Sequence, residues 1–369
     1  MTIRQKKKSP DFVLFFTVMS LLCLGVVMVF SASEYSTLVN YNDSFYFFKR
    51  QAVWAIIGLI AMRIMMKYDY WRLKHYILPI VIIAFLLLVL VLIPGIGREV
   101  NGARRWIAVG PVPFAPAEFV KLSIIIFTAF GLAQQKDRVK TFTKGVLPYL
   151  IIMSLAAGLI LMQPDLGTAM SLAGIVFVMI FAAGARIVHL SSLATAGLAA
   201  VGLAIAMEPY RLRRFLAFLD PWADPQGSGF HTIQGLYAIG SGGLFGVGLG
   251  QSKQKFLYLP ENHTDFIFAI IGEELGFIGA SLVIMLFILF IWRGLKIAVT
   301  STDPFASLLA TGITAWVGIQ SMINIGVVTG SLPVTGIPLP FISFGGTSLL
   351  FSMIGVGILL NISQFTSAR

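Results

Sequence analysis

The sequence has few charged residues, four histidines and a single cysteine, and each shortage excludes a class of protein. Charged residues make up 12% of the chain against 57% hydrophobic residues, a ratio that a water-soluble globule of 369 residues could not keep on its surface. The lone Cys23 excludes an intrachain disulfide. The histidines are scattered and form no HExxH motif, so the sequence offers no zinc site. Lipid is therefore predicted to be the main solvent of this chain.

Ten apolar runs follow one another along the chain, each near the roughly 20 residues that cross about 30 Å of hydrocarbon. Because the runs are continuous and lack strong alternation, we expect spanning helices and not a β-barrel. The sequence thus predicts an all-α integral membrane protein, with residues 1–369 forming a single polytopic domain. The expected spans are Phe12 to Phe30, Ala52 to Met66, Ile77 to Ile93, Phe119 to Leu132, Gly145 to Met162, Leu166 to Ala185, Ile187 to Met207, Phe266 to Trp292, Phe305 to Val328 and Thr347 to Ile362.

Basic residues between the spans predict the orientation of the chain. The positive-inside rule places one alternate set of loops, with both termini, in the cytoplasm. Eleven further basic residues lie on or near the outer side, against that rule. They indicate an anionic partner such as a phosphate group, with snorkelling towards lipid phosphates as the alternative. The inner set is Lys67, Arg72, Lys74, Lys136, Arg138, Lys140, Lys144, Arg186, Arg293 and Lys296. The outer set is Lys49, Arg50, Arg98, Arg104, Arg105, Lys121, Arg211, Arg213, Arg214, Lys253 and Lys255.

Two outer segments are too long to be simple connectors. Residues 94–118 contain four prolines and four glycines, which predicts an ordered, turn-rich cap. Residues 208–264 form a large extracytoplasmic loop whose aromatic content argues against disorder. Six glycines between 240 and 250 do not make a phosphate-binding loop, because the GxxxxGK[ST] motif is absent. Close-packed backbone that dips into the bilayer surface is the better interpretation.

Acidic residues near the ends of the spans are the candidates for chemistry. Asp265 directly precedes a span, where a helix-capping role and a catalytic role are equally compatible with the sequence. Glu118 and Lys121 are three residues apart at the mouth of another span, so they can pair, either structurally or as a ligand site. Glu273 and Glu274 lie about two turns into a span, where an ionised carboxylate costs about 2.5–3.5 kcal/mol. At least one of them must therefore find a cation or stay protonated.

Five long motifs occur in order along the chain: NGARRWI, APAEFVKLS, QPDLGTA, QSKQKFLYLPENHTDFIFAIIGEELGFIG and VTGIPLPFISFGGTSLL. With them the sequence resembles the SEDS family (shape, elongation, division and sporulation) over nearly its whole length, and looks closest to the FtsW and SpoVE branch. It departs from the family at Ala115-Pro116, where Gln-Pro is more usual. The resemblance implies the SEDS fold and a peptidoglycan glycosyltransferase that polymerises lipid II at the outer face of the bacterial cytoplasmic membrane, for division or sporulation.

The resemblance also implies partners and site residues. The implied partners are lipid II, a class B penicillin-binding transpeptidase and other divisome or sporulation membrane proteins; no nucleic-acid reading module is present. Asp265, the aspartate of HTDF, is implied to be the essential acid, and we interpret it as a general base on the acceptor hydroxyl. Its place before a helix should lower its pKa unless burial offsets that effect; otherwise its role is to orient the hydroxyl or to bind a metal. The predicted substrate-binding residues are Arg50, Arg105, Trp106, Glu118, Lys121, Asp165, Lys255 and His263.

The proposed chemistry needs cations more than a second carboxylate. A sugar carried on undecaprenyl pyrophosphate already has a good leaving group, which requires charge neutralisation more than a proton. Basic residues are expected to supply it; the sequence identifies no certain cofactor, and a divalent cation could share the task. Asp165 also fits a plain turn role at its membrane boundary.

Two other functions stay open on the sequence. A lipid II flippase would use the outer cations to receive the headgroup and Glu273 or Glu274 in an ion path. It would need a polar route across the bilayer, and the inner halves of the spans hold few charges. A non-catalytic scaffold that only recruits the transpeptidase would leave Asp265 and the outer basic residues without a task.

Overall fold

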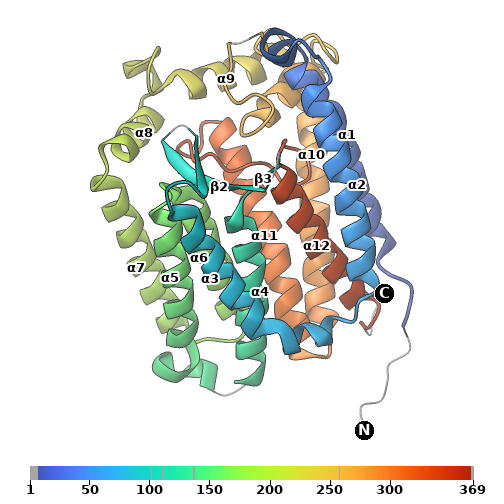
Figure 1. The fold of residues 1–369 in the computed structure, drawn as a ribbon, viewed down its shortest axis with the longest axis vertical. Helices are drawn as coiled ribbons and strands as arrows, with labels where there is room; N and C mark the ends of the chain where they lie inside the picture. Colours follow the sequence, from blue (N-terminus) through green and yellow to red (C-terminus); the bar gives the residue numbers. More distant parts are fainter. Residues whose placement is uncertain (1–6, 101, 110–111, 136–137, 257, 367–369) are drawn as a thin grey trace.

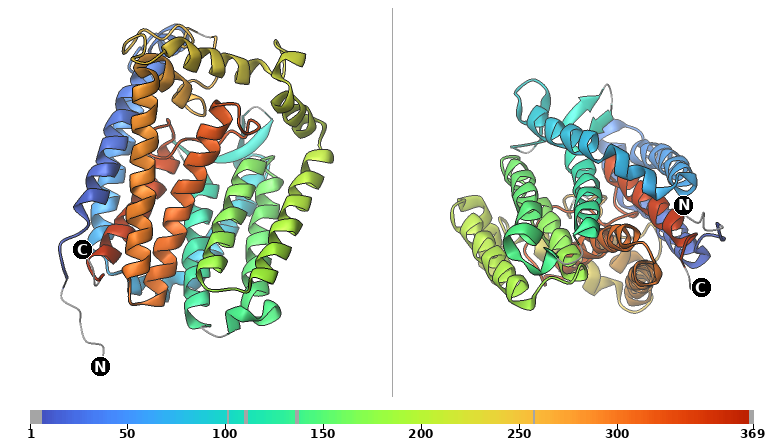
Figure 2. Two further views of the ribbon diagram at one scale, coloured as in Figure 1. Left: turned by 180° about the vertical axis from the view of Figure 1, so that it is seen from behind. Right: turned by 90° about the horizontal axis from the view of Figure 1, so that it is seen from below.

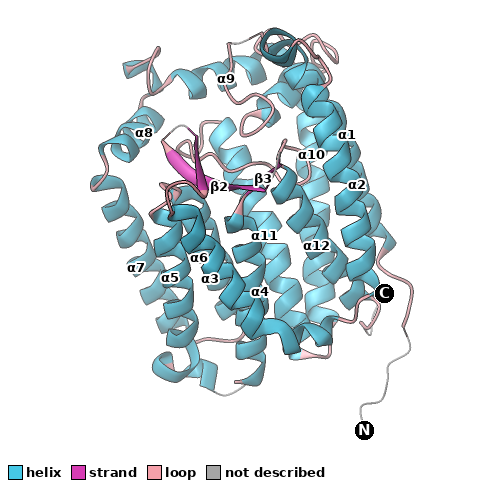
Figure 3. Cartoon of the chain, viewed as in Figure 1, coloured by secondary structure: helices cyan, strands magenta, loops and turns pink. Residues whose placement is uncertain are grey.

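The computed structural model describes residues 7–100, 102–109, 112–135, 138–256 and 258–366. Over these residues the chain forms a bundle of long helices, with a small sheet and short helices at one end (Figure 1, Figure 3). We call the end that carries residues 94–115 and 208–265 the loop end. Lys8 and Gln364, near the two ends of the described chain, lie side by side at the opposite end, which we call the terminus end (Figure 2). The predicted inner charge of Lys136 lies outside the described residues.

Ten long helices in the described part of the chain coincide with the ten predicted spans, so the all-α membrane fold is confirmed. Eight helical segments are long and apolar enough to cross a membrane. The other two helices are α6, which is slightly shorter, and α2, which carries four basic residues. The helices are α1 (Phe12–Tyr41), α2 (Tyr46–Lys67), α3 (Ile77–Leu92), α4 (Pro116–Gln134), α5 (Leu147–Leu161), α6 (Leu166–Ala182), α7 (Ile187–Ala206), α10 (Ile267–Thr300), α11 (Pro304–Val328) and α12 (Gly346–Ser363).

The first helix continues well beyond its apolar run. The run ends at Phe30, but α1 continues to Tyr41 through a polar stretch, because helical hydrogen bonds are satisfied internally in water as well as in lipid. Asn42 ends the helix in the left-handed conformation (φ 54°), with its N–H donating to the carbonyl of Leu38. Hydropathy alone therefore underestimates how far α1 projects at the loop end.

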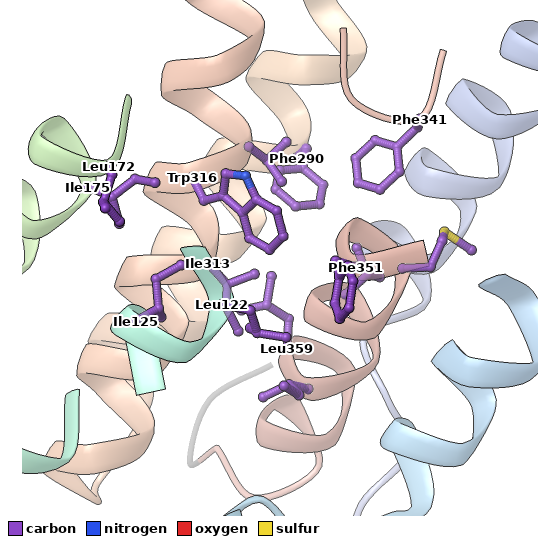
Figure 4. Close-up of a cluster of buried hydrophobic side chains, with 14 of the residues drawn as sticks. Leu122, Ile125, Leu172, Ile175, Phe290, Ile313, Trp316, Phe341, Phe351 and Leu359 are labelled. Atoms are coloured by element: carbon purple, nitrogen blue, oxygen red, sulfur yellow. The ribbon is translucent and has the colours of Figure 1, made fainter. Parts of the chain in front are cut away.

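Helix α11 is the centre of the bundle and packs against α4, α6, α10 and α12. Its Trp316 lies among Phe290 of α10 and Leu122 of α4, within a continuous apolar core (Figure 4). Helix α12 packs mainly on α2. By contrast, only 6% of the most apolar stretch of α7 is buried, so almost all of this helix is left to face lipid.

The loop end is built from a sheet and two short helices. Strands β1 (Gly97–Val100), β2 (Ala103–Val109) and β3 (Val112–Phe114) form an antiparallel sheet in that order. Helices α8 (Pro209–Leu219) and α9 (Phe230–Gly242) order the long outer loop. The predicted outer segments are thus ordered, but the strands were not predicted, because the prolines and glycines that flank them read as turns. The remaining helical turns are η1 (Tyr70–Tyr76), η2 (Arg138–Lys140), η3 (Phe142–Val146) and η4 (Pro221–Ala223).

Helix α10 is kinked at Gly276, whose backbone (φ 66°, ψ −167°) is not helical. The glycine-rich residues 243–248 lie against this kink and bond to it through their backbone. The N–H of Val247 donates to the carbonyl of Glu273 (2.9 Å), and the N–H of Phe277 donates to the carbonyl of Gly243 (2.8 Å). The kink thus exchanges helical hydrogen bonds for bonds to the loop, which agrees with the close-packed backbone expected from the glycines.

We predict that Gly276→Ala destabilises the protein. A Cβ at this position would lie 2.2 Å from the backbone nitrogen of Gly246, and the positive φ disfavours any side chain. The strained backbone alone should cost about 1–3 kcal/mol, so the thermal midpoint of the purified protein should fall. Gly158→Ala in α5 is the matched control, because a Cβ there meets nothing within 4 Å. It should leave the midpoint unchanged or raise it, and an equal loss in both variants would contradict the role of the kink.

Candidate functional site

Asp265 lies at the loop end, immediately before α10. Its Oδ2 atom lies against Gly336, where a Cβ would approach it to 3.4 Å. The residue that caps α10 is Phe266, and no side chain caps this helix. Among the described residues, the half-buried carboxylate of Asp265 accepts no hydrogen bond. The helix-capping interpretation of Asp265 is therefore wrong, and its carboxylate is left available for another partner.

The surroundings of Asp265 raise its pKa, whereas the dipole of the following helix alone would lower it. Burial, assisted by the charge of Glu261, raises the pKa of Asp265 to about 7. The positive charges of Arg105 and Arg214 act in the other direction but are too weak to prevail. Burial therefore offsets the effect of the helix, which is the alternative that the sequence left open, because desolvation outweighs the helix dipole when the carboxylate receives no cap hydrogen bonds.

Two amide side chains of α11 hold the Asp265 backbone and a buried non-helical segment, residues 337–343, which we call the re-entrant segment. The Nδ2 atom of Asn324 donates to the carbonyls of Asp265 and Ile337, each at 2.8 Å. One turn earlier, Gln320 donates to the carbonyl of Pro338 at 3.1 Å. Both amides are almost fully buried. They were not predicted as site residues, although polar side chains inside a span are a signal of function.

The two residues before Asp265 are joined to the far end of the re-entrant segment. The hydroxyl of Ser343 donates to the carbonyl of Thr264 (2.6 Å), and the N–H of Phe344 donates to the carbonyl of His263 (2.9 Å). The His263 ring stacks on Phe47 of α2, with centroids 4.3 Å apart. Burial lowers the pKa of His263 to about 4, so this predicted substrate-binding residue is neutral and packed between rings.

The predicted pair of Glu118 and Lys121 forms, with 2.9 Å between the carboxylate and the ammonium. Lys121 also donates to Gln320 Oε1 at 3.0 Å and lies over the Trp316 ring. Only 2% of the Lys121 side chain is exposed. The charge of Lys121 is thus neutralised inside the bundle. Lys121 contributes to the site indirectly, because it orients the Gln320 side chain.

Arg105 and Asp165 come together at the loop end. Arg105 projects from β2 to the turn between α5 and α6, where its Nε donates to the carbonyl of Gln163 (3.2 Å) and its Nη1 lies 3.5 Å from Asp165 Oδ2. Asp165 also accepts from the N–H of Thr168 (3.0 Å), so it caps α6 as its turn role predicted. Trp106 lies next to Arg105 on β2, and strand alternation directs it to the other face of the sheet.

A cavity of about 490 Å³ opens beside these residues, between α5, α6, α7, α8 and α11. Three arginines line it, Arg105, Arg211 and Arg214, the last of which donates to the carbonyl of Val334 (3.3 Å). Most of the remaining lining is apolar, for example Leu161, Met170, Val201, Ile205, Phe215 and Ile323. The sequence placed Arg211 and Arg214 among the outer cations without assigning them to the site. The cavity combines positive charge with an apolar wall, which suits an anion attached to a hydrocarbon chain.

Two basic residues predicted to bind substrate, Lys255 and Arg50, do not line this cavity. Lys255 is 2% exposed, and its ammonium lies 3.6 Å from Glu274 and donates to the carbonyl of Gly250. Glu274 thereby obtains the cation expected for one of the two intramembrane carboxylates. Arg50 is exposed and lies over the Tyr46 ring. Contacts of Lys255 and Arg50 with substrate stay predictions. A bound divalent cation also stays a prediction; the described residues contain no group of three or more His, Cys, Asp or Glu side chains placed to hold a metal.

The chain is similar to known proteins over nearly its whole length. The family model for cell cycle proteins of the FtsW, RodA and SpoVE type matches residues 12–368. Stage V sporulation protein E of Bacillus subtilis is 50% identical over 362 residues, covering 98% of this chain and 99% of that one. The probable peptidoglycan glycosyltransferase FtsW of Trichlorobacter lovleyi is 43% identical over 353 residues, covering 96% and 93%.

Solved structures share the fold. The rod shape determining protein RodA of Thermus thermophilus superposes with a TM-score of 0.73 at 29% identity, covering 98% of both chains. A chain of a peptidoglycan synthase complex superposes with a TM-score of 0.77 at 31% identity, covering 96% of this chain and 97% of that one. The likeness therefore extends over the whole bundle, including the loop end.

We predict that Asp265→Asn stabilises the protein at high pH. Because the pKa is raised in the folded state, the folded chain binds more protons than the unfolded chain between about pH 4 and pH 7, and native stability falls as the pH rises through that window. The gain in thermal midpoint from Asp265→Asn should thus be larger at pH 8 than at pH 5. Hydrogen bonds from Ser228 lower the pKa of Asp224, so the control Asp224→Asn should destabilise at pH 8. A gain for Asp265→Asn that is independent of pH would contradict the raised pKa.

Proposed function

Since this chain belongs to the cell cycle protein family of FtsW, RodA and SpoVE, we propose that it is a peptidoglycan glycosyltransferase that polymerises lipid II for division or sporulation. The curated relatives named probable peptidoglycan glycosyltransferases support the enzyme class. The observation that carries the proposal is the Asp265 carboxylate. It has a pKa of about 7 and no hydrogen-bond partner among the described residues, and charges of the arginine-lined cavity act on it.

Asp265 is the general base in this mechanism. The hydroxyl oxygen of the acceptor sugar attacks the anomeric carbon of the donor sugar, and the bond from that carbon to the pyrophosphate oxygen breaks. The proton of the hydroxyl passes to Asp265, and undecaprenyl pyrophosphate leaves with the electron pair. A base with a pKa of about 7 suits this step, because general-base catalysis is most effective when the pKa lies near the working pH.

The arginines of the cavity stabilise the leaving pyrophosphate. Arg105 is fixed by the carbonyl of Gln163 and by Asp165, and Arg214 by the carbonyl of Val334, so their charges are placed before substrate arrives. Such preorganised charge lowers the barrier without the cost of reorganisation during the reaction. The apolar wall between α5, α6 and α7 receives the first part of the polyprenyl chain, and the exposed face of α7 leaves the rest in lipid.

The positive-inside rule supports a topology with the loop end outside the cytoplasmic membrane and both termini in the cytoplasm. The described members of the inner basic set, which exclude Lys136, fall at the terminus end, at the ends of α2, α4 and α10 and the start of α7. Asp265 and the cavity then face the compartment in which the glycan strand is made. A class B penicillin-binding protein is the proposed partner, and a chain of a peptidoglycan synthase complex with this fold supports it.

Polymer formation from lipid II tests the function. The chain should be purified with a class B penicillin-binding protein, supplied with lipid II in detergent, and assayed for glycan polymer on a gel. Removing the base with Asp265→Asn should slow polymerisation by about 10²–10⁴-fold, whereas the exposed Asp224→Asn in the same loop should keep the native rate. Polymer from both variants would sink the assignment of Asp265. No polymer from the native complex would favour a flippase or a scaffold.

We predict that Asn324→Leu slows polymerisation, although it leaves every charged side chain of the site in the sequence. Loss of the two hydrogen bonds frees the Asp265 backbone, and a displacement of about 1 Å can cost about 10²-fold in rate. Asn361→Leu is the matched control, because Asn361 is equally buried and also bridges backbone groups, at Met66 and Tyr70, but at the terminus end. Both changes should lower the thermal midpoint, and only Asn324→Leu should lower the rate per folded molecule. Equal rates in the two variants would show that Asn324 is merely structural.

A further inference from the structure

A second cavity lies at the terminus end, far along α10 from Asp265. It has a volume of about 360 Å³ and forms where residues 8–13 cross between the end of α10 and the end of α12. Its charged lining consists of Lys8, Arg293 and Lys296 with one acidic residue, Asp11. It shares no lining residue with the cavity beside Asp265, and the glycosyltransferase mechanism gives it no task.

The charges of this terminal cavity do not cancel. Arg293 and Asp11 form a close ion pair, with Arg293 Nε donating to Asp11 Oδ2 at 2.9 Å. Lys296 is half-buried, yet no carboxylate of the described residues lies within 4 Å of its ammonium. The Lys8 ammonium likewise has no described carboxylate partner and donates only to the carbonyl of Thr366 (3.3 Å). A half-buried lysine without a counter-ion is costly unless an anion is supplied from outside the chain.

Apolar side chains adjoin the two lysines. Phe12 and Val13 of α1 line the cavity and are 57% and 43% exposed, so they face lipid in a membrane-spanning chain. Trp292, also exposed, lies beneath the Lys296 ammonium at 5.9 Å from its ring centroid. A tryptophan beside basic residues at the end of a spanning helix is typical of the membrane interface. The terminal cavity therefore opens at the depth of the lipid headgroups.

We propose that the terminal cavity binds an anionic phospholipid, with its phosphate between Lys8 and Lys296 and its acyl chains along Phe12 and Val13 of α1. Basic pockets between spanning helices suit such headgroups, and ammonium groups pair strongly with phosphate oxygens. A free phosphate ion shares the headgroup chemistry but would leave the exposed apolar side chains unused. A zwitterionic phospholipid has the acyl chains but carries a cation that the two lysines repel.

Lipid retention by the purified full-length chain tests this proposal. The delipidated protein in detergent is titrated with dioleoylphosphatidylglycerol, dioleoylphosphatidylcholine or inorganic phosphate, and binding is followed by native mass spectrometry and by the thermal midpoint. The phosphatidylglycerol should bind and raise the midpoint more than either other probe. The double variant Lys8→Gln with Lys296→Gln should bind it at least about tenfold more weakly, since each basic residue contributes on the order of 1 kcal/mol near anionic lipid.

The control is a double variant with the same change of charge at the same end of the bundle, Lys140→Gln with Lys144→Gln, in the connection from α4 to α5. It should keep native affinity for the phosphatidylglycerol. Equal weakening in both double variants would show diffuse attraction to a basic surface and overturn the site. Stabilisation by inorganic phosphate equal to that by the phosphatidylglycerol would assign the cavity to a free anion instead. Equal binding of the two lipids would show that Lys8 and Lys296 do not select an anionic headgroup.

Discussion

The structure depends on satisfying the backbone of the re-entrant segment, residues 337–343, inside a membrane-spanning bundle. Non-helical backbone at this depth is tolerated only when protein groups replace water as hydrogen-bond partners. The side-chain amides of Gln51, Gln320 and Asn324 do so, and all three are almost completely buried. Gly25 of α1 allows the close approach, since a Cβ there would lie 2.5 Å from the carbonyl oxygen of Phe341. Without these amides the carbonyls of Ile337, Pro338 and Ser343 would lose these donors, and the backbone around Asp265 would lose its support from Asn324.

Buried lysines that are paired with carboxylates differ from the arginines that line the cavity. Two lysines are fully enclosed and paired, Lys121 with Glu118 and Lys255 with Glu274, and a buried ion pair of this kind holds geometry more than it adds stability. Arg214, by contrast, is held by the backbone carbonyl of Val334, which orients its guanidinium without cancelling its charge, and Arg105 is held by the carbonyl of Gln163 together with Asp165. Charge that can meet a pyrophosphate is therefore concentrated on the arginines, which also offer several donors in a fixed plane.

Features set by local pattern were predictable from the sequence, and those set by distant partners were not. The ten spans follow from hydropathy, and the Glu118 and Lys121 pair follows from helical spacing. The kink at Gly276 could not be predicted, because its apolar run is continuous and the bonds that replace the helix come from residues 243–248. The place of Arg214 depends on how α8 packs on α7 and on the bond from Arg214 to the carbonyl of Val334, a residue 120 positions away, which no local signal in the sequence specifies.

The protonation of Asp265 is where stability and function oppose one another. A half-buried carboxylate without a hydrogen bond from the described residues destabilises the folded chain whenever it ionises, so packing alone would favour an amide or an apolar side chain there. The cavity arginines reduce this cost but do not remove it, because none of them pairs directly with Asp265 among the described contacts. A closer arginine would stabilise the carboxylate and lower its pKa, and the base would become weaker. The distance between the carboxylate and the cations thus keeps Asp265 basic enough to accept a proton while the positive charge stays available for the leaving group.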